Sequence, residues 1–153
     1  MKKLFLALAV AAFAAGPAAA VAAPQAEVMA LVRQFLDSYN AGDTKMAIAA
    51  CADQTAIIDE FPPYEWHGTG ACATWFADYD VDATKNGITD GHATLGKPRH
   101  VDVSGDRAYV VAPADYVYKK RGTPVKETGS TITVALQKGP AGWRIIGWTW
   151  AKH

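Results

Sequence analysis

The stretch YNAGDTKMAIAACADQTAIIDEFPPYEWHG, residues 39–68, decides the fold. Asn40-Ala41-Gly42 is typical of the end of a helix, and residues 44–51 fit a second, short helix. A strand is predicted over residues 55–61, because this segment is rich in apolar and β-branched side chains and is followed by two prolines. The chain is therefore predicted to pass from helix to sheet within this stretch.

The predicted strand carries one acidic side chain on what should be its inner face. Side chains alternate between the two faces of a strand, so Ile57, Asp59 and Phe61 lie together. If Ile57 faces the core, Asp59 does too, and carboxylates are rarely buried without a partner or a purpose. Asp59 is thus the first functional candidate. The alternative is a structural carboxylate that accepts backbone hydrogen bonds or pairs with a basic neighbour.

The first 22 residues have the pattern of a secretory signal. Lys2-Lys3 form a basic start, residues 4–15 form an apolar run, and Ala20-Val21-Ala22 form a small-residue cleavage site. Gly16-Pro17 interrupts the apolar run, which argues against a membrane-spanning helix. We expect cleavage after Ala22 and a periplasmic or secreted protein with no membrane insertion.

Residues 23–153 have the size of a single domain. The whole chain has 15 basic and 15 acidic residues, and removal of Lys2 and Lys3 leaves 13 basic ones, a net charge of about −2. This balance offers no basic surface, so no nucleic-acid partner is expected. The one basic cluster, Lys119-Lys120-Arg121, falls at a predicted hairpin turn.

Helical and strand patterns are segregated along the chain, which defines the α+β class. One apolar stripe at helical spacing precedes Gly42, and a third helix is expected over residues 68–85. Turn signals then separate five candidate strands, over residues 89–95, 100–103, 107–118, 125–137 and 143–151. Short turns favour an antiparallel meander. Such a curved antiparallel sheet would wrap around the N-terminal helices as a cone with an internal pocket.

Two cysteines lie in elements that are expected to be neighbours. Cys51 falls at the end of the short second helix, and Cys72 in the first turn of the third. An exported chain permits a disulfide between them. Two buried thiols are the alternative, and the Cα separation that distinguishes the two states cannot be derived from sequence.

Four segments together resemble the nuclear transport factor 2-like superfamily, in its SnoaL-like and ketosteroid-isomerase-like branch. They are FLDSYNAGD (residues 35–43), the strand with Ile58-Asp59, Trp66-His67-Gly68 opening a helix, and GWRIIGWTW (residues 142–150). The resemblance covers essentially the whole mature chain and implies a single cone-shaped domain over residues 23–153. It implies no single function, because this fold hosts isomerases, dehydratases, cyclases, carriers and dimerisation modules.

The resemblance carries over to individual residues only in part. In steroid isomerases of this superfamily, a general base lies nineteen residues after the Asn of the Asn-Ala-Gly-Asp motif, which here is Asp59. The oxyanion-hole tyrosine corresponds to Phe35, which has no hydroxyl. The protonated aspartate of that hole should fall within residues 131–135, where no acid occurs. Each missing donor can be worth ~3 kcal/mol, so steroid isomerase activity is not expected.

An aromatic pocket around Asp59 is expected to bind a small apolar molecule. Tyr64 and His92 are the expected catalytic helpers of Asp59, whose pKa should be raised by burial. Only one of Asp115 and Tyr116 can face inward on its strand, and we favour Tyr116. The candidate ligand-binding residues are Phe35, Ile57, Phe61, Trp66, Trp75, Tyr116 and Trp148.

Three functions are compatible with these features of the sequence. The first is a lyase, isomerase or cyclase that acts on a small apolar carbonyl compound with Asp59 as base. The second is a periplasmic binding module without chemistry, and the third is a dimerisation module. Thr131, Thr133 and Ala135 would form an uncharged outer strip, which favours a homodimer. The four histidines match no zinc spacing, so no metal and no other cofactor are expected.

Overall fold

The structure is a computed structural model, and it describes residues 17–153. The basic start and the apolar run of the expected signal lie outside this range. Three helices precede or interrupt the sheet: α1 (Pro17–Asn40), α2 (Thr44–Ala50) and α3 (Ala71–Asn86). None of the helices in the described range is long and apolar enough to cross a membrane.

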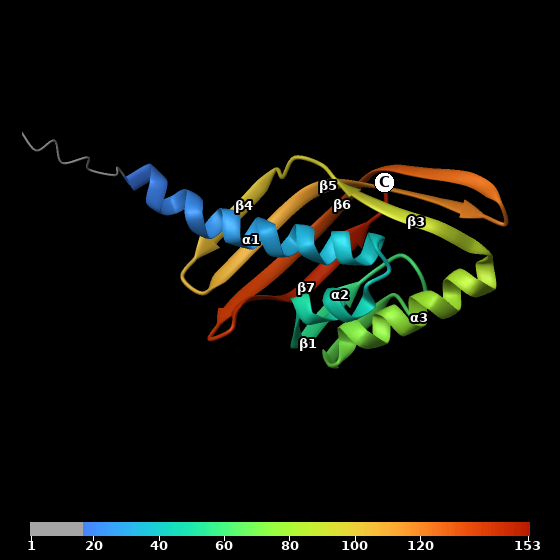
Figure 1. The fold of residues 1–153 in the computed structure, drawn as a ribbon, viewed down its shortest axis with the longest axis horizontal. Coiled ribbons are helices and arrows are strands. Elements are labelled where there is room, and N and C mark those ends of the chain that lie inside the picture. Colours follow the sequence, from blue (N-terminus) through green and yellow to red (C-terminus); the bar gives the residue numbers. More distant parts are fainter. Residues whose placement is uncertain (1–16) are drawn as a thin grey trace, which may run out of the picture.

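Seven strands form one curved, unclosed sheet behind the helices (Figure 1). The strand order is β2-β1-β7-β6-β5-β3, with β4 also paired to β5. The strands are β1 (Cys51–Ile58), β2 (Glu65–Thr69), β3 (Ile88–Leu95), β4 (His100–Ser104), β5 (Arg107–Lys120), β6 (Thr123–Gly139) and β7 (Gly142–Ala151). The predicted α+β class and curved sheet around N-terminal helices are confirmed.

The sheet differs from a simple antiparallel meander in two places. First, β1 lies parallel to β7, so the sheet is mixed. Second, β3 and β4 do not pair with each other, because both run antiparallel to β5 and occupy its two halves. Residues 96–99, between β3 and β4, interrupt the edge of the sheet beside β5, and the chain continues in the same direction after them. There, the backbone N–H groups of Gly96 and Arg99 still donate to carbonyls of β5.

The third helix begins later than expected. The sequence predicts it from residue 68, but Glu65–Thr69 pairs with β1 as a strand, and α3 starts at Ala71. Gly68 and Gly70 both have positive φ angles, 88° and 72°, which favour glycine and turn the chain from β2 into α3. Cys51 caps the C-terminal end of α2, where its backbone N–H donates to the Ile48 carbonyl, and it is also the first residue of β1.

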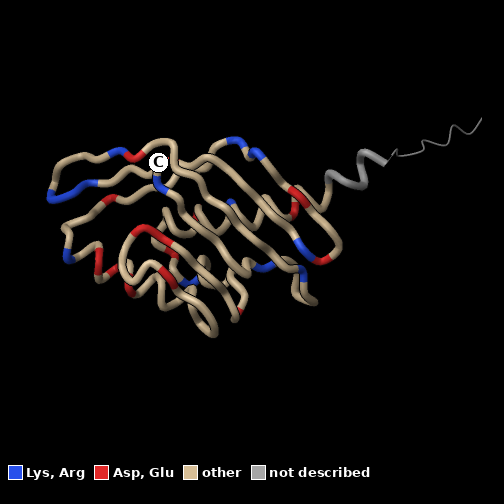
Figure 2. The backbone as a smooth tube through the Cα atoms, turned by 180° about the vertical axis from the view of Figure 1, so that it is seen from behind, with Lys and Arg blue, Asp and Glu red and all other residues tan. Residues whose placement is uncertain are grey.

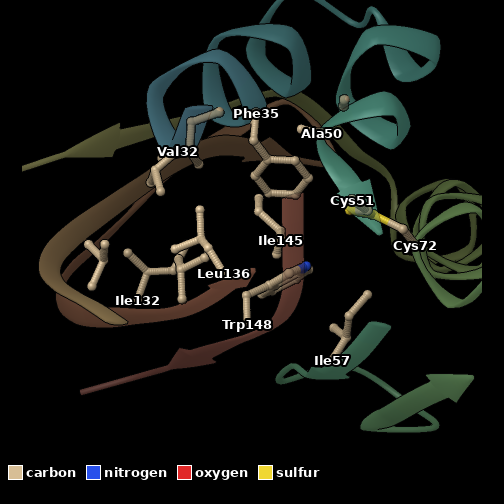
Figure 3. Close-up of a cluster of buried hydrophobic side chains, with 14 of the residues drawn as sticks. Val32, Phe35, Ala50, Cys51, Ile57, Cys72, Ile132, Leu136, Ile145 and Trp148 are labelled. Carbon is tan, nitrogen blue, oxygen red and sulfur yellow. A yellow bond between two sulfur atoms is a disulfide. The ribbon is translucent and has the colours of Figure 1, made fainter. Parts of the chain in front are cut away.

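The core lies between α1 and the concave face of the sheet (Figure 3). Val28 and Val32 of α1 are fully buried, and Phe35 follows one turn later on the same face. Alternate residues of β6, Ile132, Val134 and Leu136, face the helix, as strand periodicity predicts. The α1 helix thereby packs against the concave face of the sheet, and the candidate site lies between the two.

Cys51 and Cys72 form a disulfide, which decides between the two alternatives that the sequence leaves open. Their Cα atoms are 6.5 Å apart, within the range that a disulfide spans. The bond joins the start of β1 to the first turn of α3 (Figure 3). It therefore ties α3, which contributes to the site described next, to the strand that leads into Asp59.

Candidate functional site

A cavity of about 120 Å³ lies between α1, α3 and the concave face of the sheet. Most of its wall is aromatic, and within it Trp148 packs against both Phe35 and Trp75. Trp75 and Trp148 pack edge to face with ring centroids 4.9 Å apart, and Phe35 lies 6.0 Å from Trp148. A cavity of this volume matches a single aromatic ring, since a 150 Å³ apolar cavity accommodates benzene.

Asp59 lies on the cavity wall directly after the end of β1. Its Oδ2 accepts a hydrogen bond of 2.9 Å from the indole Nε1 of Trp75, and its Oδ1 accepts one of 2.7 Å from the backbone N–H of Glu60. Trp75 is on α3, so this contact joins α3 to the residue that directly follows β1. The carboxylate is held in one orientation, with both oxygens engaged.

The surroundings of Asp59 raise the pKa of its carboxyl group toward the range that suits a general base. Burial raises the pKa of Asp59 from 3.8 to about 6, against the opposing hydrogen bonds from Glu60 and Trp75. The negative charge of Glu127 adds to the rise in pKa. A carboxyl with this pKa is ionised at neutral pH, yet it binds a proton more readily than an exposed aspartate.

Three tyrosine hydroxyl groups meet on the cavity wall. Tyr39 of α1 donates a hydrogen bond of 3.1 Å to Tyr116 of β5, and the hydroxyls of Tyr79 and Tyr116 are in hydrogen-bond contact. Burial raises the pKa of Tyr39 and of Tyr116, so both stay neutral donors. Two bonds among three hydroxyls use two protons, which leaves one O–H for a ligand.

The tyrosine cluster is positioned by an irregular part of β3. A register shift between Thr89 and His92 brings Gly91 against the Tyr116 hydroxyl, where a Cβ atom would collide with it. Next to it, the Asn40 side chain donates to the Ala93 carbonyl and accepts from the Ala93 N–H, both at 2.8 Å. These contacts anchor the end of α1, and with it Tyr39, to the sheet.

Six of the predicted site residues line this cavity. They are Asp59, Phe35, Phe61, Trp75, Tyr116 and Trp148. Tyr116 faces inward as expected, while Asp115 accepts a hydrogen bond from the backbone N–H of Gly129. Phe35 lies in the wall with no hydroxyl to offer. The position of the family's tyrosine thus remains apolar, and Tyr39, one helical turn further on, is the α1 residue of the lining that carries a hydroxyl.

Four predicted site residues lie elsewhere. Ile57 is completely buried in the core, and Trp66 packs on Phe61 while its Nε1 donates to Asp78. Tyr64 is 57% exposed, because its positive φ of 74° turns the side chain to solvent. His92 is exposed because its neighbour Ala93 takes the inward position on β3. Neither expected helper of Asp59 therefore places its side chain in the cavity.

Tyr39 and Tyr79 also line the cavity, but they are not among the site residues predicted from the sequence. The signal that could have identified them is their spacing, four residues after Phe35 and after Trp75 respectively. Tyr79 stacks on Trp75 at 5.6 Å, which links the tyrosine cluster to the residue that holds Asp59.

The mouth of the cavity carries a second group of charges. Glu60 and Tyr118 line it, and Glu127 lies behind them with Lys152. Glu127 Oε1 accepts from Lys152 Nζ at 2.6 Å and from the Tyr118 hydroxyl at 3.0 Å. Burial and the charge of Glu127 raise the pKa of Glu60. Although burial acts in the opposite direction, the bonds from Lys152 and Tyr118 lower the pKa of Glu127.

A cone of helices and curved sheet around an internal cavity is the architecture of nuclear transport factor 2-like proteins. Such a protein from Salmonella enterica serovar Typhimurium aligns with a TM-score of 0.73 at 19% identity, over 86% of this chain and 92% of its own. A ketosteroid isomerase-like protein from Erwinia carotovora aligns with a TM-score of 0.67 at 17% identity, over 85% and 96%. At these identities the likeness concerns the fold.

Within this superfamily, the chain belongs to the SnoaL-like family, whose domain model matches residues 28–149. The resemblance noted from the sequence is thereby confirmed. A protein of unknown function from Mycobacterium tuberculosis is also similar in structure, with a TM-score of 0.71 at 14% identity, over 90% of this chain and 76% of its own. No protein with curated function matches the sequence.

Proposed function

We propose that this protein is an exported, cofactor-independent acid–base enzyme, a lyase, isomerase or cyclase that acts on a small carbonyl compound. The observation that carries the proposal is the Asp59 carboxylate on the wall of an aromatic cavity, with a pKa of about 6. A base with that pKa, shielded from water and held by Trp75, is suited to removing a proton next to a carbonyl.

The proposed reaction uses two parts of the cavity lining, the Asp59 carboxylate and the tyrosine cluster. Asp59 takes a proton from the carbon next to the carbonyl, the electron pair of the broken C–H bond forms a carbon–carbon double bond, and the π pair of the carbonyl moves to its oxygen. The free O–H of the tyrosine cluster donates to that oxygen and stabilises the enolate. Return of the proton to another carbon gives an isomer, and loss of a leaving group from the adjacent carbon gives a lyase product.

Proton exchange tests this role before the natural substrate is known. Incubation of one-ring ketones such as phenylacetone with the protein in D2O should replace the protons next to the carbonyl, as followed by ¹H NMR. Asp59→Asn should abolish the catalysed exchange and keep the fold, as judged by circular dichroism. Asp53→Asn, at an exposed position of β1, is the matched control. Equal exchange rates in wild type and Asp59→Asn would exclude Asp59 as the base.

The second candidate function is ligand binding without chemistry. It is favoured by Phe35, which removes the family's oxyanion donor from the cavity wall. A carrier would bind phenols and ketones with equal affinity in wild type and Asp59→Asn, and would catalyse no exchange. Trp148→Ala should then weaken the affinity for every ligand in a thermal-shift assay, and unchanged affinity would exclude this candidate.

We also propose that the convex face of the sheet forms a homodimer. Thr131, Thr133 and Ala135 of β6 face away from the core beside Gly147 and Thr149 of β7. Charged residues lie mainly around the margins of this face, which is seen in Figure 2. Sedimentation at high concentration should show a dimer, and Thr133→Arg should shift it to monomer. A wild-type protein that stays monomeric would exclude the interface.

A further inference from the structure

We infer that the natural ligand of this cavity carries a cationic nitrogen, as a protonated amine or a quaternary ammonium group, on a body of about one ring. The inference rests on the proposed function, because it concerns the ligand of the same cavity. Three features of the cavity and its surroundings support it. They are the aromatic faces of the lining, an excess of carboxylates over basic side chains, and a buried carboxylate oxygen of Glu127 behind the wall.

The first feature is the density of aromatic faces. Nine of the sixteen lining residues are Phe, Tyr or Trp, and four others are aliphatic or alanine. At the mouth, Tyr116 and Tyr118 are stacked at 5.1 Å, and Trp150 meets Tyr116 edge to face at 6.4 Å. The negative faces of such rings attract ammonium groups, and aromatic cages of this kind recognise quaternary ammonium ligands.

The second feature is the sign of the charges. The three charged residues of the lining, Asp59, Glu60 and Asp82, are all acidic, and within residues 23–153 no Lys, Arg or His lines the cavity. Lys152 is close by, 3.5 Å from Glu60, but its shorter contact is with Glu127. The three carboxylates of the lining and Glu127 behind it outnumber the one nearby ammonium group, so the cavity favours cations over anions.

The third feature is Glu127, which supplies charge from behind the wall. Its side chain is only 10% exposed. Oε1 is bound by Lys152 and Tyr118, but Oε2 is buried, and no N–H or hydroxyl group of the described residues donates to it. The carboxyl group of Glu60 is within hydrogen-bond reach of Glu127 and can donate only when it is protonated. A buried carboxylate oxygen left unpaired is costly, and a cation bound against the adjacent Glu60 and Tyr118 would offset that cost electrostatically.

A metal ion is a poorer fit to the same charges. Within the described part of the chain, no three His, Cys, Asp or Glu side chains are arranged to hold one. Single carboxylates spread around an aromatic wall suit an organic cation, which needs one or two polar contacts and much apolar surface. The carbonyl group of the proposed reaction and the cationic nitrogen would then belong to one molecule, an amino ketone or a related compound.

Matched ring compounds of different charge test the inference by calorimetry at pH 8 on the whole protein. Benzylamine and benzyltrimethylammonium should bind at least tenfold more tightly than neutral benzyl alcohol, and benzoate should bind most weakly. The double variant Glu60→Gln, Asp82→Asn should reduce the preference for the cations to threefold or less and keep the affinity for benzyl alcohol. Asp80→Asn, exposed on α3, is the control and should keep the full preference.

The outcomes separate this inference from the proposed function. If benzyl alcohol or benzoate binds as tightly as the cations, the inference is overturned, while proton exchange that depends on Asp59 would still support the enzyme. If cations bind preferentially and Asp59→Asn leaves exchange unchanged, the inference stands and the enzyme fails. If none of the ring compounds binds, the inference is overturned, because the ligand is then not of this size and charge.

Discussion

Replacement of Asp59 by asparagine should stabilise the protein near neutral pH, although it removes the proposed base. Burial raises the pKa of Asp59 from 3.8 to about 6, so the folded state binds a proton that the unfolded chain has already released. Between these two pH values the unfolded chain binds fewer protons than the native one, and stability falls as the pH rises. Ionised Asp59 is therefore a cost to the folded state at pH 7.

The size of the effect follows from the two pKa values. A difference between 3.8 and about 6 corresponds to about 3 kcal/mol, at about 1.4 kcal/mol per pKa unit. Asparagine has one acceptor oxygen, so it cannot satisfy both Trp75 and the Glu60 N–H, and one lost bond costs about 1 kcal/mol. The variant should be less stable than wild type by about 0.5 kcal/mol at pH 4, where the unfolded Asp59 is already about half ionised, and more stable by about 2 kcal/mol at pH 8.

Urea denaturation at pH 4, 5, 6, 7 and 8, followed by tryptophan fluorescence, measures this difference. Glu60 and Glu127 titrate in both proteins, so their contributions largely cancel when the two curves are subtracted. Asp53→Asn, at an exposed position of β1, controls for the loss of one carboxylate. The reasoning is refuted if the difference in unfolding free energy between wild type and Asp59→Asn is the same at every pH. A stabilised, inactive variant would instead show that a functional group is kept at the expense of stability.

Two further changes test the framework that holds the site. Replacement of Cys51 and Cys72 by alanine should lower the unfolding free energy by about 3 kcal/mol, because the bond closes a loop across 21 residues. An unchanged urea midpoint in the variant would contradict this. Gly91→Ala should displace the Tyr116 hydroxyl and weaken phenol binding at least tenfold in a thermal-shift titration, whereas Gly139→Ala, whose Cβ meets no neighbouring atom, should bind phenol normally. Equal phenol affinity in both variants would show that the tyrosine cluster does not bind the ligand.

Part of the site could be predicted because it depends on local periodicity. The alternation of strand side chains placed Asp59 on the same side as Ile57, and helical spacing turned Phe35 and Trp75 inward. Tyr64 shows the limit of that reasoning. It is close to Asp59 in sequence, but a left-handed backbone conformation points its side chain to solvent. Proximity along the chain therefore did not imply proximity in the cavity.

His92 shows a second limit, because a strand irregularity decides which residues face inward. The register shift in β3 leaves Ala93 opposite Tyr116 and turns His92 outward. The same shift brings Gly91 against the Tyr116 hydroxyl. Neither the shift nor its consequence has a reliable signature in the sequence, since both depend on how β3 pairs with β5.

The sequence by itself determined the class of the fold, the SnoaL-like resemblance and the inward position of Asp59. These follow from residue periodicity, turn residues and local motifs, all of which act over a few positions. Only the tertiary structure decided that Cys51 is bonded to Cys72, that Trp75 holds Asp59, and that Tyr39, Tyr79 and Tyr116 share one hydroxyl cluster. These contacts join residues 16 to 77 positions apart, and they arise from sheet curvature, strand register and helix packing. Such features depend on the whole chain at once, because each element's position is set by the elements packed against it.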